Sequence, residues 1–178
     1  MEKILKLLKM PFVRIGLGLG VLVIVGAAAG GLAISQIPPQ QPIQFPHNVH
    51  VGLGAQCIYC HPAVTWGPDA GLPTTDKCWG CHQQVQKKSP ELEKLAEYAR
   101  ANSAIPWVPV AIQPDFVHFN HQNHIAAQIN CETCHGEISK MTVAKPQPRQ
   151  NMGWCLNCHQ KMRPDDFTRL SDCSLCHY

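Results

Sequence analysis

The longest run of apolar residues in the chain extends without a charged side chain from Ile15 to Ser35. About 20 apolar residues in helical conformation cross a hydrocarbon core of about 30 Å, so this run predicts one transmembrane helix. Positive charge ahead of a span favours a cytoplasmic N-terminus. We therefore predict a cytoplasmic segment at 1–14, an anchor at 15–35 and every later residue on the outer side of a bacterial plasma membrane. The basic residues ahead of the span are Lys3, Lys6, Lys9 and Arg14.

A cleaved signal peptide is the alternative interpretation of this run, because Ala27–Ala33 is rich in the small residues that a signal peptidase prefers. The apolar core of a signal peptide is usually about 7–15 residues long. The run observed here is longer than that. The length favours a retained single-pass anchor.

Beyond the anchor, hydrophobic and polar residues do not alternate as they do in strands. For most of that length they also lack the 3.6-residue period of amphipathic helices. Residues 36–46 are rich in Pro and Gln and predict an extended spacer. Ser89 and Pro90 precede apolar residues at helical spacing, which predicts one short amphipathic helix with a serine cap. The expected fold is a mainly α-helical and coil domain at 47–178 with little regular secondary structure, plus the N-terminal transmembrane helix.

All ten cysteines belong to five copies of Cys-x-x-Cys-His. Structural zinc takes four ligands, and five cysteine pairs cannot be divided into such sites without a remainder. Neither zinc nor dithiol redox chemistry explains a histidine after every second cysteine. The motif is typical of covalent c-type haem attachment, in which both thiols bond to the porphyrin and the histidine binds iron. The predicted attachment cysteines of five c-type haems are Cys57, Cys60, Cys78, Cys81, Cys131, Cys134, Cys155, Cys158, Cys173 and Cys176.

The external domain contains an internal duplication. A Phe-x-His-x-x-His block ahead of a haem motif occurs twice, with an offset of 74 residues between Cys57 and Cys131. The two modules span 45–82 and 119–159, and an extra haem motif follows at 173–177. The matched residues of the two blocks are Phe45, His47 and His50 in the first and Phe119, His121 and His124 in the second.

Histidines outside the motifs are as numerous as the predicted haems. Haem iron takes two axial ligands, and the motif histidines predicted to be proximal are His61, His82, His135, His159 and His177. The duplication favours four distal ligands, which are His47, His50, His121 and His124. The fifth distal ligand is left open: the histidine count favours His118, whereas Met141 or Met152 would give a His/Met haem of higher reduction potential.

Haem irons with side-chain ligands at both axial positions favour electron transfer over catalysis, because haem catalysis needs an open coordination position. The sequence therefore predicts a protein that is not itself an enzyme. The formal charge of +3 arises in residues 1–14, which hold four Lys/Arg and one Glu, whereas the remainder holds 11 of each sign. Haem propionates would make the external domain acidic, so nothing indicates nucleic-acid binding.

Phe-x-His-x-x-His ahead of a haem motif resembles the small class-three-type multihaem cytochromes c. More specifically, four segments resemble the membrane-anchored pentahaem cytochrome c subunit of alternative complex III. In that family a methionine usually matches Met141 and an aromatic residue often stands at the position of His118, so the resemblance favours Met141 as the fifth ligand. The four segments are Ile105–Pro109, Pro114–His121, Cys134–Met141 and Met152–His159.

The resemblance implies an electron-transfer subunit of a quinol:acceptor oxidoreductase of a respiratory or photosynthetic chain. The implied partners are an integral membrane quinol-binding subunit and an iron–sulfur subunit. Electrons would pass to a downstream cytochrome c or blue copper protein, with the haem domain on the periplasmic side. Two alternatives are an anchored quinol dehydrogenase cytochrome of the periplasmic nitrate-reductase type and a catalytic multihaem reductase, the latter predicting a high-spin iron.

Overall fold

The structure is a computed structural model that describes residues 10–34, 37–85, 88–147 and 150–178. It divides into a unit that ends at Ile37 and a second unit, Pro38–Tyr178, which we call the cytochrome unit. Several predicted features lie outside the described residues: the end of the anchor at Ser35, the start of the spacer at Gln36, and Lys3, Lys6 and Lys9.

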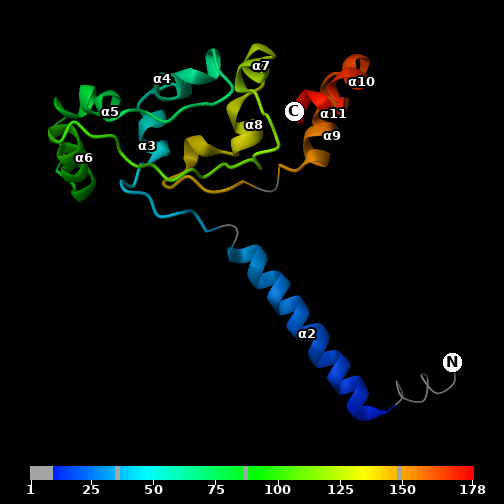
Figure 1. Ribbon diagram of the computed structural model, residues 1–178. Coiled ribbons are helices and arrows are strands. Elements are labelled where there is room, and N and C mark those ends of the chain that lie inside the picture. The colour runs from blue at the N-terminus through cyan, green and yellow to red at the C-terminus, as the bar shows by residue number, and fades with distance from the viewer. Residues whose placement is uncertain (1–9, 35–36, 86–87, 148–149) are drawn as a thin grey trace. The chain divides into compact units, whose positions relative to one another are not determined.

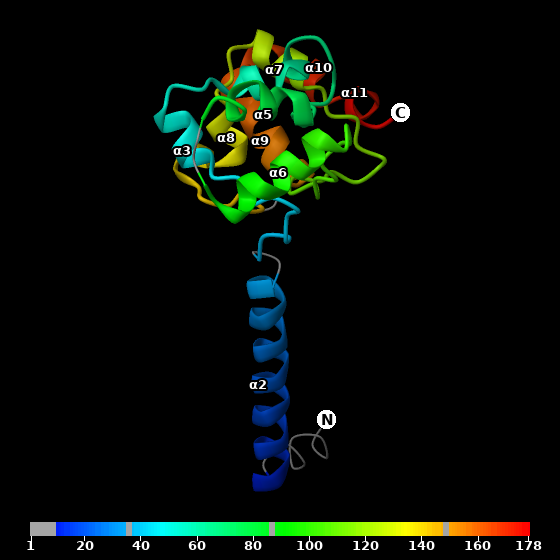
Figure 2. The same ribbon diagram turned by 90° about the vertical axis from the view of Figure 1, so that its left-hand side faces the viewer.

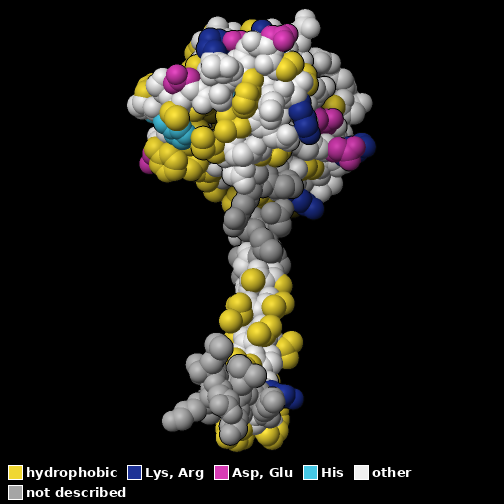
Figure 3. Space-filling view, turned by 90° about the vertical axis from the view of Figure 1, so that its right-hand side faces the viewer, with side chains coloured by type: hydrophobic (Ala, Val, Ile, Leu, Met, Phe, Trp, Pro, Cys, Tyr) yellow, Lys and Arg dark blue, Asp and Glu magenta, His cyan; other side chains and the backbone are white. Residues whose placement is uncertain are grey.

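The first unit contains the helix α2 (Pro11–Ile34), which begins four residues before the predicted anchor (Figure 1). Pro11 is suited to the first turn of a helix because the missing amide hydrogen would have no partner there. Among the described residues, α2 is the one helix that is long and apolar enough to cross a membrane. Hydrophobic side chains run along its visible face (Figure 3). A signal sequence would have the same properties, so a retained anchor remains a prediction.

The cytochrome unit consists of short helices joined by coil, and its described residues include no strand (Figures 1 and 2). This confirms the predicted fold class. Its α-helices are α3 (His47–Gly52), α4 (Cys57–Cys60), α5 (Thr75–His82), α6 (Pro90–Arg100), α7 (His121–Ala126), α8 (Cys131–His135), α9 (Met152–Met162), α10 (Phe167–Leu170) and α11 (Cys173–Cys176). Its 3-10 turns are η1 (Pro62–Thr65), η2 (Ile138–Lys140) and η3 (Pro164–Asp166).

The helix α6 forms where the sequence predicts it. The Ser89 side chain caps its N-terminus by accepting a hydrogen bond of 3.3 Å from the Leu92 backbone N–H, which satisfies one amide that the helix leaves unpaired. Leu95 on this helix is 4% exposed and packs with Ile43 and Ile105. Most of the segment predicted as a spacer, residues 38–46, therefore belongs to the cytochrome unit and contributes Ile43 to its core.

The apolar core made by protein side chains is small. Among the described residues, four hydrophobic side chains are buried, and the largest of their exposed fractions is 8%. A chain of this length normally buries a larger continuous core. A small core of protein side chains is expected of a domain built around haems, whose porphyrins would add apolar contacts. The four residues are Ile43, Val64, Leu95 and Ile105.

The duplication extends to the backbone. In each copy the helix that carries the two histidines of the block is followed, two residues past its end, by a left-handed residue, Gly54 with φ 92° after α3 and Gln128 with φ 59° after α7. The next residue closes the same turn in both: Ala55 N–H donates to the His50 carbonyl at 3.1 Å, and Ile129 N–H donates to that of His124 at 3.0 Å. The two blocks therefore fold alike, although only one carries glycine at the left-handed position.

Gln128→Gly is expected to stabilise the protein by about 0.5–1 kcal/mol. A side chain in the left-handed region costs roughly 1–2 kcal/mol, and the greater unfolded-state entropy of glycine offsets part of the gain. Thermal unfolding of the haem-loaded full chain, followed by circular dichroism, measures the change. The matched variant Gly54→Gln should lower stability, because its new side chain meets open space and only the backbone is strained. Equal stability in all three proteins would contradict this account.

Candidate haem-binding sites

Each Cys-x-x-Cys pair lies on one helical turn of α4, α5, α8, α9 or α11. Residues three apart share one face of a helix, so the two thiols of a pair face the same side. Side-chain caps fix the start of four of these helices. All ten thiols are free of disulfide bonds. The capping residues are Thr74 for α5, Asn130 for α8, Asn151 for α9 and Asp172 for α11.

Three pairs of histidine rings lie at nearly the same centroid separation, with interplanar angles of 64°, 4° and 29°. Each pair joins a motif histidine to one predicted distal histidine. Two imidazoles that bind one metal ion at about 2 Å through facing nitrogens place their ring centroids about 6 Å apart. The observed centroid separations match this arrangement. They are 6.0 Å for His50 and His82, 6.3 Å for His121 and His135, and 6.2 Å for His124 and His159.

The hydrogen bonds of the rings leave the second nitrogen available to a metal. In six histidines Nδ1 lies 2.6 to 3.0 Å from a backbone carbonyl oxygen. A carbonyl can only accept, so Nδ1 carries the hydrogen and Nε2 keeps a free lone pair. Metal-binding histidines are commonly oriented by such a bond. The bonded pairs are His50–Pro46, His61–Gly71, His121–Pro68, His124–Asn120, His159–Leu170 and His177–Phe116.

Comparison with known proteins identifies the family. Residues 49–144 match the family model described as cytochrome c3, and residues 117–178 match that of cytochrome c7 and related cytochrome c. The chain is a multihaem cytochrome c. It is also 32% identical over 162 residues to the multiheme cytochrome c subunit of menaquinone reductase from Nitratidesulfovibrio vulgaris, covering 78% of this chain and 77% of that protein.

Membership in this family identifies the bound group as covalent c-type haem, and the site residues fit it. Thiols in pairs provide thioether attachment, and imidazoles with a free Nε2 provide iron ligands. When bound, haem supplies a one-electron change between ferric and ferrous iron. The multihaem cytochrome c is therefore an electron-transfer protein.

His47 lies near the first haem motif. Burial, followed by the nearby rings of His61 and His50, lowers the pKa of His47 to about 4. Burial and neighbouring rings likewise lower the pKa of His82 and of His135. These imidazoles are neutral at physiological pH, which is the form that binds a metal. The first histidine of each block thus lies near the first motif of its copy and the second faces the second motif.

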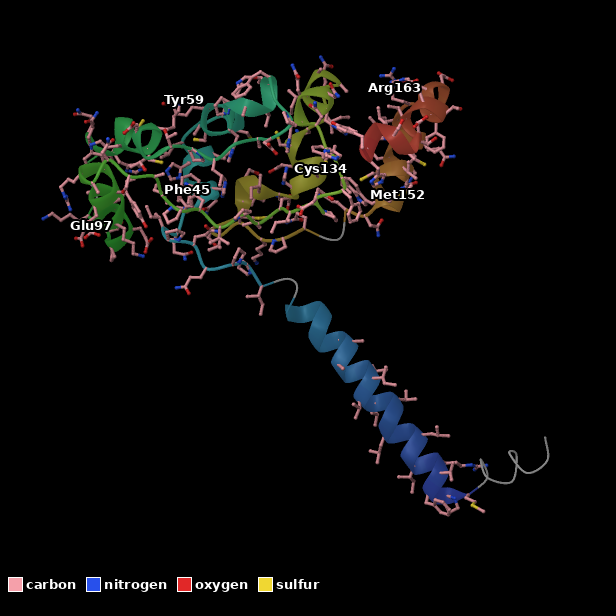
Figure 4. The ribbon with its side chains drawn as sticks, in the orientation of Figure 1. Phe45, Tyr59, Glu97, Cys134, Met152 and Arg163 are labelled. Carbon is pink, nitrogen blue, oxygen red and sulfur yellow. The ribbon has the colours of Figure 1, made fainter. Side chains whose placement is uncertain are left out.

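Phe45 and Phe119 each pack against both histidines of their own block. Phe45 packs edge-on to His47 at 4.8 Å and 83°, and stacks on His50 at 4.2 Å and 23°. Phe119 repeats this arrangement with His121 at 4.8 Å and 89° and with His124 at 4.4 Å and 31°. Figure 4 labels Phe45 beside α3. The sequence signalled this role through the identical spacing of phenylalanine in both blocks, but the motif alone did not reveal it.

Phe119→Leu is expected to change the electron paramagnetic resonance of two ferric haems while leaving haem content unchanged. The g-values of a low-spin haem depend on the angle between its two ligand planes, and this substitution frees the rings of His121 and His124. Phe167→Leu removes an aromatic ring from α10 and serves as the control. A spectrum of Phe119→Leu identical to that of the wild type would show that the ring does not orient the ligands.

Of the candidates for the fifth distal ligand, His118 and Met141 lie in different parts of the cytochrome unit. His118 lies beside the fifth motif, because its backbone N–H donates to the Cys176 carbonyl at 2.8 Å, yet its ring stacks on Tyr178 at 4.1 Å. Met141 lies beside α3, where its carbonyl accepts from Asn48 N–H at 3.0 Å. The ring of His177, the motif histidine of the fifth site, stacks with Phe116 at a centroid separation of 5.9 Å. The fifth ligand remains a prediction.

Cysteine thiols from different motifs lie close enough to affect one another. Burial is the main reason why the pKa values of these thiols are raised, and a neighbouring thiol adds to the effect. Because each thiol marks one edge of a haem site, these electrostatic interactions indicate which sites are neighbours. Outside its own motif, Cys78 interacts with Cys60, Cys131 with Cys57, Cys134 with Cys155 and Cys158, and Cys155 with Cys176.

Proposed function

We propose that this cytochrome binds five covalent haems and relays electrons as one subunit of a membrane complex that reacts with quinone. The ten motif cysteines attach the haems and the five motif histidines are proximal ligands. His47, His50, His121 and His124 are the distal ligands of four haems. His118 or Met141 completes the fifth.

The observation that carries this proposal is that, at three sites, a motif histidine lies opposite a second histidine with ring centroids 6.0 to 6.3 Å apart. Side chains then occupy both axial positions of an iron, and a substrate has no position to bind. This argues against a catalytic multihaem reductase. The role of the chain is to hold, orient and shield the haems.

The anchor and the resemblance to the alternative complex III subunit support a quinone-linked complex in which electrons leave quinol. Quinol would be oxidised at an integral membrane subunit with an iron–sulfur subunit close by. Electrons would then reach a cytochrome c or blue copper protein on the periplasmic side. The helix α2 would hold the cytochrome unit at the outer surface of the bacterial plasma membrane, with its N-terminus in the cytoplasm.

A second candidate function runs in the opposite direction. The relative from Nitratidesulfovibrio vulgaris is named as part of a menaquinone reductase, and that name describes delivery of electrons to a quinone. The same row of haems can carry electrons either way, because direction depends on the potentials of donor and acceptor. This candidate keeps the membrane complex and exchanges the roles of its two partners.

Purification under mild detergent, followed by rapid mixing with menaquinol, tests the proposal. We expect a quinone-binding membrane subunit and an iron–sulfur subunit to copurify, and menaquinol to reduce the haems of the whole complex but not those of the isolated cytochrome. Haem oxidation by menaquinone after reduction would instead establish the second candidate. Rapid reduction of the isolated cytochrome by menaquinol would favour the nitrate-reductase type of quinol dehydrogenase and contradict the relay.

A further inference from the structure

The five haem motifs do not follow one another in space as they do in the sequence. Number the sites 1 to 5 in chain order, by their helices α4, α5, α8, α9 and α11. Figure 1 shows α5 at one end of the cytochrome unit, α4 and α8 in the middle, and α9 and α11 toward the other end. Site 2 is therefore displaced to an end, although it is second in the chain.

Contacts between side chains join site 2 to site 1. Lys77 of α5 places its ammonium group 4.4 Å from the centre of the Tyr59 ring of α4, within the range of a cation–π contact. The thiols of Cys60 and Cys78 also interact. Because α3 carries both His47 and His50, one turn of helix provides distal histidines near both sites.

Site 1 is joined to site 3, and the two copies meet there. The segment after η1 binds the start of α7: the His121 N–H donates to the Pro68 carbonyl at 3.0 Å, and His121 Nδ1 lies 2.6 Å from the same oxygen. The thiols of Cys57 and Cys131 interact across this junction. Each copy therefore turns its first site toward the other copy and its second site outward.

Sites 4 and 5 extend the row beyond site 3. Helix α7 supplies His121 to site 3 and His124 to site 4, and the Gln150 side chain donates to the carbonyl of Cys134. Between sites 4 and 5, α10 packs on α9, and His159 Nδ1 donates to the Leu170 carbonyl at 3.0 Å. The thiols of Cys155 and Cys176 interact as well.

We propose that the chain holds its haems in one unbranched row in the order 2, 1, 3, 4, 5, so that the sites of α5 and α11 are its two ends. The inference rests on the proposed function, because it presumes five haems that exchange electrons. Each transfer along the row oxidises one iron and reduces its neighbour by one electron, with no bond or proton change. The quinone-linked partner and the periplasmic partner would therefore meet the row at sites 2 and 5, and sites 1, 3 and 4 are interior.

Proton NMR of the fully reduced full-length protein in detergent micelles tests the order directly. Nuclear Overhauser contacts assign each haem to its own cysteines and then connect haems that lie side by side. We expect connections between sites 2 and 1, 1 and 3, 3 and 4, and 4 and 5. A connection between sites 2 and 3, or between sites 1 and 5, would overturn the proposal. Failure of the proposed function appears separately, as fewer than five haems or as high-spin irons in the same sample.

A pair of variants gives a second test that does not depend on resolving every haem signal. His50→Met and His121→Met each raise the potential of one haem, at site 2 and at site 3, so that haem is reduced first. Reduction at site 2 should shift the ferric signals of site 1 alone. Reduction at site 3 should shift those of sites 1 and 4. A shift at site 3 after reduction of His50→Met at site 2 would contradict the row.

Discussion

Replacing His121 by alanine is expected to turn one low-spin haem of the loaded cytochrome into a high-spin haem that binds carbon monoxide. The ring centroids of His121 and His135 lie 6.3 Å apart, the separation expected of two imidazoles that bind one iron. Loss of one ring leaves that iron with an open position. Absorption spectra with and without carbon monoxide, together with electron paramagnetic resonance of the ferric protein, measure the change in one haem out of five.

Two variants provide the controls for this result. Gln122→Ala changes the exposed neighbour of His121 on α7 and should leave all five haems low-spin. His121→Met should restore a sixth ligand and raise the potential of that haem. Five low-spin haems in His121→Ala would remove His121 from the set of iron ligands.

Loss of haem attachment at an interior site is expected to unfold the cytochrome unit, whereas loss at the end of the row should not. The four hydrophobic side chains that are buried among the described residues are too few to form a stable core, so we expect porphyrin to supply most of the apolar contacts. Cys131→Ser combined with Cys134→Ser removes the haem that both copies adjoin. Cys173→Ser combined with Cys176→Ser removes the haem at one end.

Circular dichroism during heating and haem content per chain measure this difference. The site 5 double variant should retain a cooperative unfolding transition and four haems. The site 3 double variant should show no cooperative transition, and chain that lacks covalently attached haem should accumulate or be degraded. Equal stability of the two double variants would show that the haems are not the core of the domain.

Local signals in the sequence were sufficient for several elements. Ser89 and Pro90 fix the start of α6, because a serine cap and a proline in the first turn act within one turn of the chain. The fold class was also predictable, because the pattern beyond the anchor lacks the alternation of strands. The duplication of Phe-x-His-x-x-His pointed to two similar blocks, and the matching backbone turns at Gly54 and Gln128 agree with it.

Relations between distant segments could not be predicted. The contact between the rings of His50 and His82 depends on where α5 lies after a long connection. No local sequence pattern encodes that position. Packing of Ile43 against Leu95 was likewise hidden, although an apolar residue in a Pro-rich and Gln-rich segment was a signal that could have been used. The fifth distal ligand depends on how the segment around His118 meets the last motif.

Carbon monoxide titration of the fully reduced wild-type protein, scaled to its haem content, tests the central claim most directly. The claim is that side chains of this chain occupy both faces of every iron and leave the haems to carry electrons. The account predicts five haems per 19.7 kDa chain and no rapid binding of carbon monoxide. Ready binding to several haems, or a haem content well below five, would contradict it.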